Sequence, residues 1–405
     1  MKVLRDKRVL LCVGGGIAAY KACDVVRRLG EVGAAVQVAM TPAACRFITP
    51  LTLQTLSRRA VATDLLSENE EASIGHIRIA ETADAVLVAP ATADLIARMA
   101  AGMANDIVTA ALLVTQAPVV VAPAMNSHML EHPAVRANIE TLRSFGHRIV
   151  EPDVGDLACG YQGPGRLPDP PVLLEELAAA LTAQDLSGRR VLVSAGPTRE
   201  AIDPIRFISN RSSGRMGYAV AAAARRRGAS VTLVTGPSAL ALPHGCEVVR
   251  VETAAHMGQA LRDRVTASDV VVMVAAVADY RPAETAAHKI KKSSERIELA
   301  LQRNEDILAA LAGAKGRRVL VGFAAETRDV VAHAEGKLQR KGLDLIVAND
   351  VGAPGAGFDV DTNSAVLIDR NGERTESGLV SKEDLADLIL DKVVELLANR
   401  KRQSA

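Results

Sequence analysis

The residues best suited to chemistry in this chain gather in a long polar connection at positions 196–217. It follows the strand-like pattern of 190–194 and precedes the helical pattern of 218–227. Connections between a strand and a helix usually take about two to six residues, and this one is several times longer. It carries four arginines and the sequence Asn-Arg-Ser-Ser-Gly at 210–214. Because doubly wound folds bind ligands at the carboxyl ends of their strands, the loop predicts a phosphate-type anion site rather than a plain surface insertion.

A second glycine-rich turn follows the first strand-like run of the chain. Its residues Gly14, Gly15 and Gly16 begin a G-x-G-x-x-A pattern, which is weak evidence alone. A dinucleotide site also needs an acid at the end of the second strand, and that strand ends without one. The turn therefore indicates either tight helix–strand packing or a mononucleotide phosphate site, for which FMN fits better than NAD. Further phosphate contacts are available at the strand-end residues Thr41, Pro90 and Thr92.

Three more side chains of the first half stand in loops or at strand ends, namely His76, Asn126 and Cys159. A lone histidine is more often structural than catalytic, and an asparagine after a strand can cap the next helix. A cysteine on a loop can be incidental, but a glycine-hinged loop is also how a lid brings an acid to a substrate. Together the three residues offer a base or orienting group, an amide that can bind a carboxylate, and a thiol.

The second half has its own polar residues after apolar strands. Asp279 follows the strand pattern of 270–274 and either caps a turn or holds Mg²⁺ or a ribose. The basic run that begins at Lys289 is either a solvated edge or a set of phosphate contacts. Lys337 and Lys341 are four residues apart, share one helix face and allow the same two interpretations. The chain has no GxxxxGK[ST] sequence, so it is not a P-loop enzyme.

Composition excludes several classes of protein. The formal net charge is +1, so no global field recruits nucleic acid or membrane, and aromatic residues at 2% without tryptophan provide no base-stacking platforms. The 5 cysteines are scattered, which is neither a disulfide framework nor a zinc pattern. No apolar run reaches the length of a membrane span, and no secretory signal is visible. We therefore expect a soluble, cytoplasmic protein without nucleic-acid or membrane partners.

The 405 residues exceed what one hydrophobic core normally serves, so two domains are expected. A series of strand and helix patterns fills the first half, and a second series follows a short polar linker at 184–188. We predict an α/β protein of two doubly wound, Rossmann-like domains with mainly parallel sheets, covering 1–184 and 185–405. Strands are predicted at 9–13, 35–40, 85–89, 119–122 and 148–150, and then at 191–194, 231–235, 248–251, 270–274, 319–322, 345–348 and 365–368.

The chain resembles the bifunctional phosphopantothenoylcysteine decarboxylase / phosphopantothenate–cysteine ligase family of bacterial coenzyme A biosynthesis. The motifs that carry the resemblance are GGGIAAYK, the His of SIGHI, PAMN, ACGYQGPGR, SAGPTREAIDPIRFISNRSSGRMG, AAVADYRP, KIKK and GFAAET, in the family's order over nearly the whole chain. Such a set is highly specific. One departure is the sequence Asn-Glu-Asp-Ile at 304–307, where the family usually has Asn-Pro-Asp-Ile. We expect the lost proline to change the stiffness of this loop without abolishing activity.

For the first half, the resemblance implies an FMN-dependent decarboxylase. FMN oxidises the cysteinyl thiol end of the substrate, the carboxylate leaves as carbon dioxide, and reduced flavin returns a hydride while an acid protonates the other carbon. The implied roles are base or substrate orienter for His76, contact to the substrate for Met125 and Asn126, and proton donor on a flap for Cys159. The implied FMN contacts are Gly14, Gly15, Gly16, Thr41, Phe47, Pro90 and Thr92.

For the second half, the resemblance implies a ligase that joins 4'-phosphopantothenate to L-cysteine. CTP activates the carboxylate as an acyl-cytidylate, pyrophosphate leaves, and the cysteine amine attacks. The implied catalytic residues are Asn210 and Lys289, with Lys289 acting in the activation step. The implied substrate contacts are Arg206, Asn210, Ala275 and Ala276. The implied CTP contacts are Asp279, Lys289, Asn304, Glu305, Asp306, Ile307, Phe323, Lys337 and Lys341, and Asp279 is also the candidate ligand of Mg²⁺.

The resemblance also implies a homo-oligomer in which decarboxylase halves form trimers with FMN at subunit contacts, ligase halves form dimers, and the whole is a dodecamer. Two rival hypotheses remain. An NAD-dependent reductase on paired Rossmann folds is disfavoured because the strands that end at Thr41 and Thr235 lack the ribose-binding acid. A flavin-binding regulatory subunit without activity is disfavoured because His76, Asn126 and Cys159 are all present.

Overall fold

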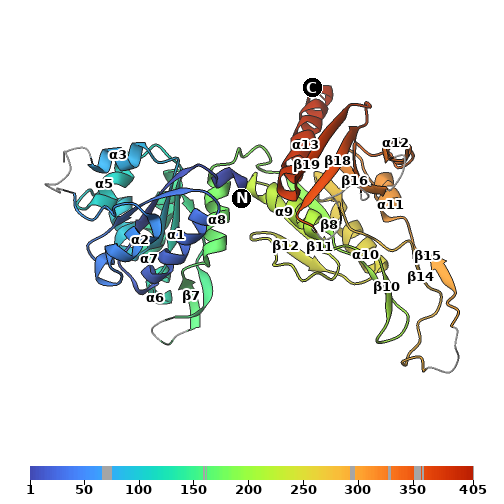
Figure 1. The fold of residues 1–405 in the computed structure, drawn as a ribbon, viewed down its shortest axis with the longest axis horizontal. Coiled ribbons are helices and arrows are strands. Elements are labelled where there is room, and N and C mark those ends of the chain that lie inside the picture. Colours follow the sequence, from blue (N-terminus) through green and yellow to red (C-terminus); the bar gives the residue numbers. More distant parts are fainter. Residues whose placement is uncertain are drawn as a thin grey trace. The chain divides into compact units, whose positions relative to one another are not determined.

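The computed structural model describes residues 1–65, 75–157, 160, 162–291, 297–326, 330–350, 357 and 360–404. Contacts along the chain separate two compact units, Met1–Ala183 and Gln184–Ala405. In both units helices pack on the faces of a mainly parallel sheet (Figure 1), which confirms the predicted α/β fold class. Within the described residues, no helix combines the length and the apolar character needed to cross a membrane.

The sheet of the amino-terminal unit is parallel, with the strand order β2-β1-β3-β4-β5. Its strands are β1 (Arg8–Val13), β2 (Ala35–Met40), β3 (Ala85–Ala91), β4 (Val119–Pro123) and β5 (Arg148–Ile149). The predicted strands of this half are confirmed, because short continuous apolar runs suit parallel strands that are buried on both faces. The order reverses direction at β1, so the carboxyl ends of β1 and β3 frame a crevice.

Helices cover both faces of this sheet. Alternate residues of β1 point to opposite faces, so Val9 and Leu11 lie in one hydrophobic core while Leu10 lies in the other. The helices are α1 (Ala22–Glu31), α2 (Pro50–Ser57), α3 (Gly75–Glu81), α4 (Ala93–Ala100), α5 (Ile107–Val114), α6 (Ser127–Glu131), α7 (Pro133–Ser144) and α8 (Pro170–Ala180), with short 3-10 turns at Lys2–Leu4, Ile17–Lys21 and Ala44–Arg46.

The glycine-rich segment around Cys159, which we predicted as a loop, contains an antiparallel pair. Strand β6 (Asp153–Asp156) pairs with β7 (Gln162–Arg166), and Asp156 lies opposite Gln162. Gly165 in β7 has a φ of +131°, and a Cβ there would lie 2.1 Å from the Met125 carbonyl oxygen. Glycines that looked like loop signals therefore serve the close approach of β7 to the turn after β4.

The sheet of the carboxyl-terminal unit has the strand order β12-β11-β8-β13-β16-β17-β18-β19. The first six strands in this order are parallel to one another, and β18 and β19 run antiparallel at one edge. The strands are β8 (Arg190–Ala195), β11 (Ser230–Thr235), β12 (Glu247–Arg250), β13 (Val270–Met273), β16 (Val319–Glu326), β17 (Leu345–Asp350), β18 (Thr362–Asp369) and β19 (Arg374–Ser381). The predicted strands are confirmed, and β19 was missed because its sequence is largely polar.

Two helix layers cover this second sheet. Helices α9 (Arg215–Arg226) and α13 (Lys382–Ser404) share one core, and α10 (Ala254–Val265), α11 (Ile307–Gly313) and α12 (Val330–Arg340) pack on the other face. The buried guanidinium of Arg227, just after α9, pairs with Asp185 at 2.6 Å and with Asp391 of α13 at 2.7 Å. The predicted linker thus begins the packing of the second unit, since Leu186 is also buried there.

Two short antiparallel ribbons extend from the carboxyl-terminal unit beyond its sheet (Figure 1). Strand β9 (Arg199–Ala201) pairs with β10 (Phe207–Ser209), and β14 (Tyr280–Pro282) pairs with β15 (Leu301–Arg303). Strands of three residues carry too little periodicity to be predicted from sequence. The first ribbon lies inside the long connection of 196–217, which is therefore a folded structure rather than an irregular loop.

Candidate active sites

The amino-terminal unit has a cavity of about 860 Å³ at the carboxyl ends of its strands, which we call the amino-terminal cavity. This is the edge where doubly wound sheets bind ligands. The sequence-predicted residues that line it are Gly15, Gly16, Thr41, Thr92, Met125 and Asn126. Its other lining residues include Ile17, Tyr20, Lys21, Asp94, Arg98, Met129, Asp156, Leu157 and Leu167.

Close backbone contacts shape the glycine turn after β1. The Gly14 N–H donates to the Pro90 carbonyl oxygen at 3.0 Å, so these two predicted contacts hold each other behind the cavity wall. A Cβ at Gly15 would lie 2.3 Å from the Ala43 Cβ, a distance that no side chain can occupy. The backbone can approach a ligand closely here, which is the arrangement that phosphate-binding turns use.

Two threonine hydroxyl groups stand at the same edge. The buried Thr41 Oγ1 accepts a hydrogen bond from the Ala44 N–H at 3.1 Å. The Thr92 Oγ1 accepts from the Leu95 N–H at 3.2 Å and caps α4. Because each oxygen is used as an acceptor, its hydroxyl proton can still be donated to an anion. Phe47, the remaining predicted contact, is exposed and lies outside the lining of the amino-terminal cavity.

Arg98 was not identified from the sequence, yet it lines the amino-terminal cavity. Its guanidinium pairs with the buried Asp106 at 2.6 Å and with Asp94 at 2.9 Å. Burial alone would raise the pKa of Asp106, but hydrogen bonds from the Thr109 N–H and from Arg98 outweigh it and hold the pKa below its ordinary value. In the sequence, Asp94 and Arg98 resemble an ordinary surface ion pair on a helix, so nothing there indicated that Arg98 lines a cavity.

Asn126 lies where the chain turns from β4 into α6. Its Oδ1 accepts a hydrogen bond from the His128 N–H at 2.8 Å, so the side chain caps α6 and also lines the cavity. The Met125 N–H donates to the Gly165 carbonyl oxygen of β7 at 3.0 Å. The two alternatives for Asn126, helix cap and ligand contact, are therefore compatible with each other.

His76 and Cys159 differ from the other predicted residues of this half. His76 is the second residue of α3 and lies outside the cavity lining, and its buried Nδ1 has no hydrogen-bond partner among the described residues. Cys159 lies outside the described residues. Asp156 and Leu157, which precede it, line the cavity, so the segment that leads to Cys159 passes along the site.

The carboxyl-terminal unit has a cavity of about 490 Å³ at the carboxyl ends of β8 and β13, where the strand order reverses. We call it the switch-point cavity. The sequence-predicted residues that line it are Asn210, Ala275, Ala276, Asp279, Phe323 and Lys337. Its other lining residues include Gly196, Arg211, Ser212, Ser213, Gly214, Asn349, Asn363 and Lys382.

The long connection is fastened to the turn that follows β13. The buried Thr198 Oγ1 accepts from the Ala278 N–H at 2.9 Å, and the Asn210 Nδ2 donates to the Val277 carbonyl oxygen at 2.9 Å. These bonds hold the wall of the switch-point cavity between two segments that are far apart in sequence. Asn210 uses only a donor in this bond, so its amide oxygen can still accept.

The N-terminus of α9 opens at this cavity. Its N-cap, Gly214, has a φ of +83° and provides no side-chain cap, so N–H groups of the first turn are left for a ligand. A Cβ at Gly217 would lie 2.5 Å from the Ala195 Cβ, so glycine lets α9 pack directly on β8. A helix terminus with free N–H groups and a positive dipole end suits a phosphate.

Of the two lysines predicted on one face of α12, only Lys337 lines the cavity, where its Nζ donates to the Phe323 carbonyl oxygen at 2.7 Å. Lys341 lies outside it and pairs with Asp306 at 2.8 Å. Burial would raise the pKa of Asp306, but the bond from Lys341 and the Ala309 N–H outweigh it and lower the pKa.

The predicted nucleotide segment 304–307 lies outside the lining of the switch-point cavity. The buried Asn304 Nδ2 donates to the Ala278 carbonyl oxygen at 2.8 Å, and Glu305 pairs with Arg262 at 2.8 Å. Asp306 caps α11, and Ile307 packs in the core. Asn304 thus supports the same turn after β13 that carries Asp279.

Arg206 and Lys289 lie near the β9–β10 ribbon rather than in the cavity lining. The Arg206 guanidinium pairs with the buried Asp203 at 2.5 Å and donates to the Ile290 carbonyl oxygen at 2.9 Å. This arginine, helped by backbone N–H donors, holds the pKa of Asp203 well below its usual range. Lys289 is exposed, and its neighbour Ile290 is fixed from both sides because its N–H donates to Asp203 at 3.1 Å.

Asn349, at the end of β17, was missed by sequence reasoning. It lines the switch-point cavity, and its buried Oδ1 has no partner among the described residues. A buried unpaired acceptor costs about 1–3 kcal/mol, so its presence in a cavity wall indicates a ligand donor. The sequence contained a signal for it, because Asn349, like the predicted Asp279, is a polar residue that follows an apolar strand pattern.

Within the described residues, no group of three or more His, Cys, Asp or Glu side chains could hold a metal ion. Asp279 is a single carboxylate at the cavity edge. Mg²⁺ commonly binds through one or two carboxylates together with phosphate oxygens of the substrate. The donor set therefore fits a metal that arrives with a nucleotide and does not fit a dedicated protein site.

Comparison with known proteins covers the chain from end to end. Residues 2–182 match the family described as flavoprotein, and residues 186–397 match the DNA/pantothenate metabolism flavoprotein C-terminal domain. The coenzyme A biosynthesis bifunctional protein CoaBC of Bacillus subtilis (strain 168) is 48% identical over 398 residues, which are 97% of this chain and 98% of the relative. The protein of the same name from Escherichia coli (strain K12) is 47% identical over 405 residues, 99% of this chain and 100% of the relative.

The chain belongs to the family of coenzyme A biosynthesis bifunctional proteins. The amino-terminal unit of this family member is a flavoprotein unit, and the switch-point cavity lies in the other matched region. Among solved structures, a C-terminal domain of CoaBC is 40% identical and covers 54% of this chain and 100% of that chain, with a TM-score of 0.47. A PPC decarboxylase complexed with pantothenoylaminoethenethiol is 25% identical and covers 42% of this chain and 94% of that chain, with a TM-score of 0.38.

Proposed function

We propose that this chain converts 4'-phosphopantothenate and L-cysteine to 4'-phosphopantetheine in two steps. The unit of about residues 185–405 ligates the two substrates with CTP through an acyl-cytidylate. The unit of about residues 1–184 then decarboxylates the product, 4'-phosphopantothenoylcysteine, with FMN. The observation that carries the proposal is that each family-matched region contains its own phosphate-type cavity at the carboxyl ends of parallel strands.

The amino-terminal cavity fits FMN. The glycine turn at Gly15 and the hydroxyl groups of Thr41 and Thr92 would hold the phosphate, and apolar side chains such as Met129 and Leu167 would contact the ring. Bound FMN supplies the electron sink that an unactivated carboxylate lacks. Asn126 would hold the substrate carboxylate by hydrogen bonding. His76 would orient the substrate or take a proton, and Cys159 would donate the final proton.

The switch-point cavity fits a nucleotide and an acid to be activated. The N-terminus of α9 would bind phosphate, and Phe323, Lys337 and Asn349 would contact the nucleotide. Asp279 would hold Mg²⁺ together with the phosphates. Asn210 and Arg206 would hold the acyl-cytidylate. Residues 304–307 and Lys341 would also contact CTP, from segments that fix the turns around the cavity.

We further propose a homo-oligomer, with trimers of flavoprotein units and dimers of ligase units combined in a dodecamer. Two large apolar side chains in the lining of the amino-terminal cavity stay exposed, since Ile17 is 61% exposed and Tyr20 is 62% exposed. A group of exposed apolar residues beside a ligand site favours coverage by another copy of the chain. Sedimentation of the purified protein tests this, and a monomer at micromolar concentration would contradict it.

The proposed function is tested most simply on the purified chain. We expect it to be yellow and to release pyrophosphate from CTP only when 4'-phosphopantothenate is present. Addition of L-cysteine should then produce 4'-phosphopantetheine and carbon dioxide. A colourless protein that oxidises NADH while it reduces a substrate would support the NAD-dependent reductase instead. A yellow protein without either activity would support the regulatory subunit.

The two activities should be separable between Ala183 and Gln184. The Gln184 side chain donates to the Arg226 carbonyl oxygen at 3.0 Å, and Leu186 is buried in the second core, so the second unit needs its residues from Gln184 onward. A chain of 1–183 should bind FMN and decarboxylate without CTP. A chain of 184–405 should ligate without FMN. Both activities should be assayed beside the full chain, and an insoluble, colourless 1–183 would show that this boundary is wrong.

Replacing Cys159 by serine should stop the last proton transfer while carbon dioxide release continues. A serine hydroxyl is a far weaker acid than a thiol, so the variant should accumulate the oxidised, decarboxylated product. Cys23→Ser is the matched control, because the Cys23 thiol lies in α1 and burial raises its pKa. Mass spectrometry distinguishes the two products. A normal yield of saturated 4'-phosphopantetheine from Cys159→Ser would remove the cysteine from the mechanism.

A further inference from the structure

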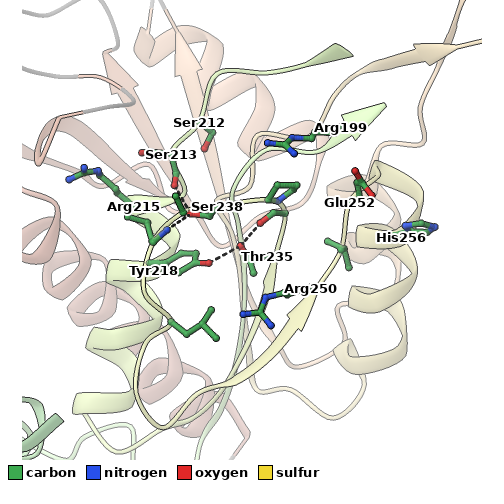
Figure 2. A pocket seen from close by; sticks show the side chains of 16 residues that line it. Arg199, Ser212, Ser213, Arg215, Tyr218, Thr235, Ser238, Arg250, Glu252 and His256 are labelled. Atoms are coloured by element: carbon green, nitrogen blue, oxygen red, sulfur yellow. Dashed lines mark hydrogen bonds between the residues drawn. The ribbon is translucent and has the colours of Figure 1, made fainter. Parts of the chain in front are cut away.

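The carboxyl-terminal unit has a second and larger cavity, of about 1170 Å³, at the carboxyl ends of β11 and β12. We call it the arginine cavity. Two arginines line it from separate elements (Figure 2): Arg199 from β9 and Arg250 from β12. Arg215 of α9 and His256 of α10 also line it, and the Arg215 guanidinium pairs with Asp361. The rest of the polar lining consists of hydroxyl groups, at Ser212, Ser213, Tyr218, Thr235 and Ser238, and of one carboxylate, Glu252. No role was assigned to this cavity from the sequence.

Two of its arginines have no acidic partner. Neither Arg199 nor Arg250 makes a side-chain hydrogen bond or ion pair with any other described residue. The Arg199 guanidinium instead stacks on the Phe207 ring at 4.6 Å, which fixes its position without neutralising its charge. By contrast, the Arg227 guanidinium is paired with both Asp185 and Asp391. Unpaired guanidinium groups in the wall of one cavity are suited to an anionic ligand.

The arginine cavity adjoins the switch-point cavity, because the two share part of their walls. Ser212, Ser213 and Arg215 line both. These residues flank Gly214, the N-cap of α9, so the positive end of the helix and its free N–H groups lie between the two cavities. An extended anion bound at this terminus can therefore have one end in each cavity.

Hydrogen bonds hold the rim of the arginine cavity in place. The Ser238 Oγ donates to the Ser213 carbonyl oxygen at 3.0 Å and accepts from the Leu240 N–H at 3.2 Å. The Arg199 N–H donates to the Glu252 carbonyl oxygen at 2.8 Å, which ties β9 to the end of β12. Figure 2 shows Tyr218 bonded to Thr235, with 3.3 Å between their hydroxyl oxygens, at the base of the site. The rim from which the arginines extend is thus fixed by hydrogen bonds.

The proposed ligase reaction requires a place for such an anion. In the activation step a carboxylate oxygen forms a bond to the α-phosphorus of CTP, and the bond from that phosphorus to the bridging oxygen of the β-phosphate breaks. The bonding electrons go to the leaving pyrophosphate, which gains a negative charge. Attacking and leaving oxygens lie roughly in line, so the leaving group departs on the side opposite to the carboxylate. Fixed cations on that side stabilise the charge as it develops.

We propose that the arginine cavity is the subsite for the β- and γ-phosphates of the nucleotide, and that it holds the pyrophosphate formed from them. Arg199 and Arg250 are its principal contacts, and Ser212 and Ser213 lead the phosphate chain from the α9 terminus into it. The inference rests on the proposed ligase function and extends it, because it assigns the leaving-group side of the reaction to residues outside the switch-point cavity.

The test uses the full chain and inorganic pyrophosphate as the probe. The double variant Arg199→Gln and Arg250→Gln should bind pyrophosphate at least about tenfold more weakly in calorimetry, since each charge-assisted hydrogen bond lost weakens binding substantially. Inhibition of ligation by pyrophosphate should weaken to the same extent, while the affinity for CMP stays unchanged. Arg317→Gln is the matched control, because Arg317 is exposed and lines neither cavity.

Each outcome of this test decides the proposal. Weaker pyrophosphate binding with unchanged CMP binding supports it, and equal pyrophosphate binding by the double variant and the wild type overturns it. Loss of CMP binding as well would assign the arginines to folding of the unit, which also overturns it. The single variant Arg250→Lys, with a cation kept at an exposed position, should retain part of the pyrophosphate affinity. If the wild type releases no pyrophosphate from CTP, the ligase function itself fails, and that result is recognised before any variant is made.

Discussion

Replacing Gly15 by alanine is expected to weaken FMN binding and decarboxylation strongly while leaving ligation intact. A Cβ at this position would lie 2.3 Å from the Ala43 Cβ and 2.8 Å from the Ala43 carbonyl carbon. Both distances are far below van der Waals contact, so either the glycine turn or the turn after β2 must move. Overpacking of this kind costs about 1–3 kcal/mol, and here the displaced backbone is the proposed phosphate cradle. FMN affinity should therefore fall at least about tenfold.

The matched control for this prediction is Gly30→Ala. Gly30 lies within α1 of the same unit, and a Cβ there meets nothing within 4 Å. The visible absorbance of bound flavin after gel filtration measures occupancy, and pyrophosphate release from CTP measures the ligase. Full flavin occupancy in Gly15→Ala would show that the glycine turn does not hold the phosphate. Equal loss in Gly30→Ala would point to general instability of the unit.

The second large effect is expected in the ligase half-reactions. Lys289→Gln should lower pyrophosphate release from CTP and 4'-phosphopantothenate by about 10²–10³-fold, since a fixed cation at developing phosphate charge contributes several kcal/mol. The backbone of Ile290 is bound by both Asp203 and Arg206, which places Lys289 beside the proposed substrate contact Arg206. Lys291→Gln is the control, because Lys291 is a cation of the same basic run and is also exposed.

Asn210→Ala should fail at a later stage of the same reaction. The neutral Asn210 amide holds the wall of the switch-point cavity through Val277 and is suited to bind the acyl-cytidylate by hydrogen bonds. The variant should form the mixed anhydride and convert it to product slowly. Quenching reactions with labelled CTP separates the two steps. Accumulation of the anhydride by Lys289→Gln, or its absence from Asn210→Ala, would contradict these roles.

The parallel strands could be predicted because each is a short apolar run between turn residues, and such runs have few alternatives in a protein of this size. The short ribbons could not, since β9 and β14 have three residues each and are fixed by tertiary contacts. The antiparallel pair β6–β7 was missed for a different reason. Its glycines were interpreted as loop residues, whereas Gly165 serves a close approach to Met125.

Position at a strand end could predict which side chains line a cavity. Thr41, Thr92, Asn126 and Asp279 all follow strands and all line a cavity. Arg98 was missed because its partners make it look like a surface residue. The arginine cavity was missed because its walls come from β9, α9, β12 and α10, and only the folded chain brings these elements together.

Some residues that were expected to contact the nucleotide lie outside the cavity lining. Their side chains bind other groups of the protein. Lys341 pairs with Asp306, and Asn304 is bonded to the turn that carries Asp279. Charge and spacing in a sequence cannot reveal which of these partners a side chain adopts. The proposed contacts of Asn304 and Lys341 with CTP therefore remain predictions, and they require a change in these bonds when the nucleotide binds.

The central claim is that one chain carries both reactions, and a single isotope experiment tests it most directly. The purified, flavin-containing chain is given CTP, 4'-phosphopantothenate and L-cysteine labelled at the carboxyl carbon. We predict that pyrophosphate, labelled carbon dioxide and 4'-phosphopantetheine appear in equal amounts, and that nothing forms when CTP is omitted. Pyrophosphate release with all the label retained in 4'-phosphopantothenoylcysteine would contradict the decarboxylase assignment, and 4'-phosphopantetheine formed without consumption of CTP would contradict the ligase assignment.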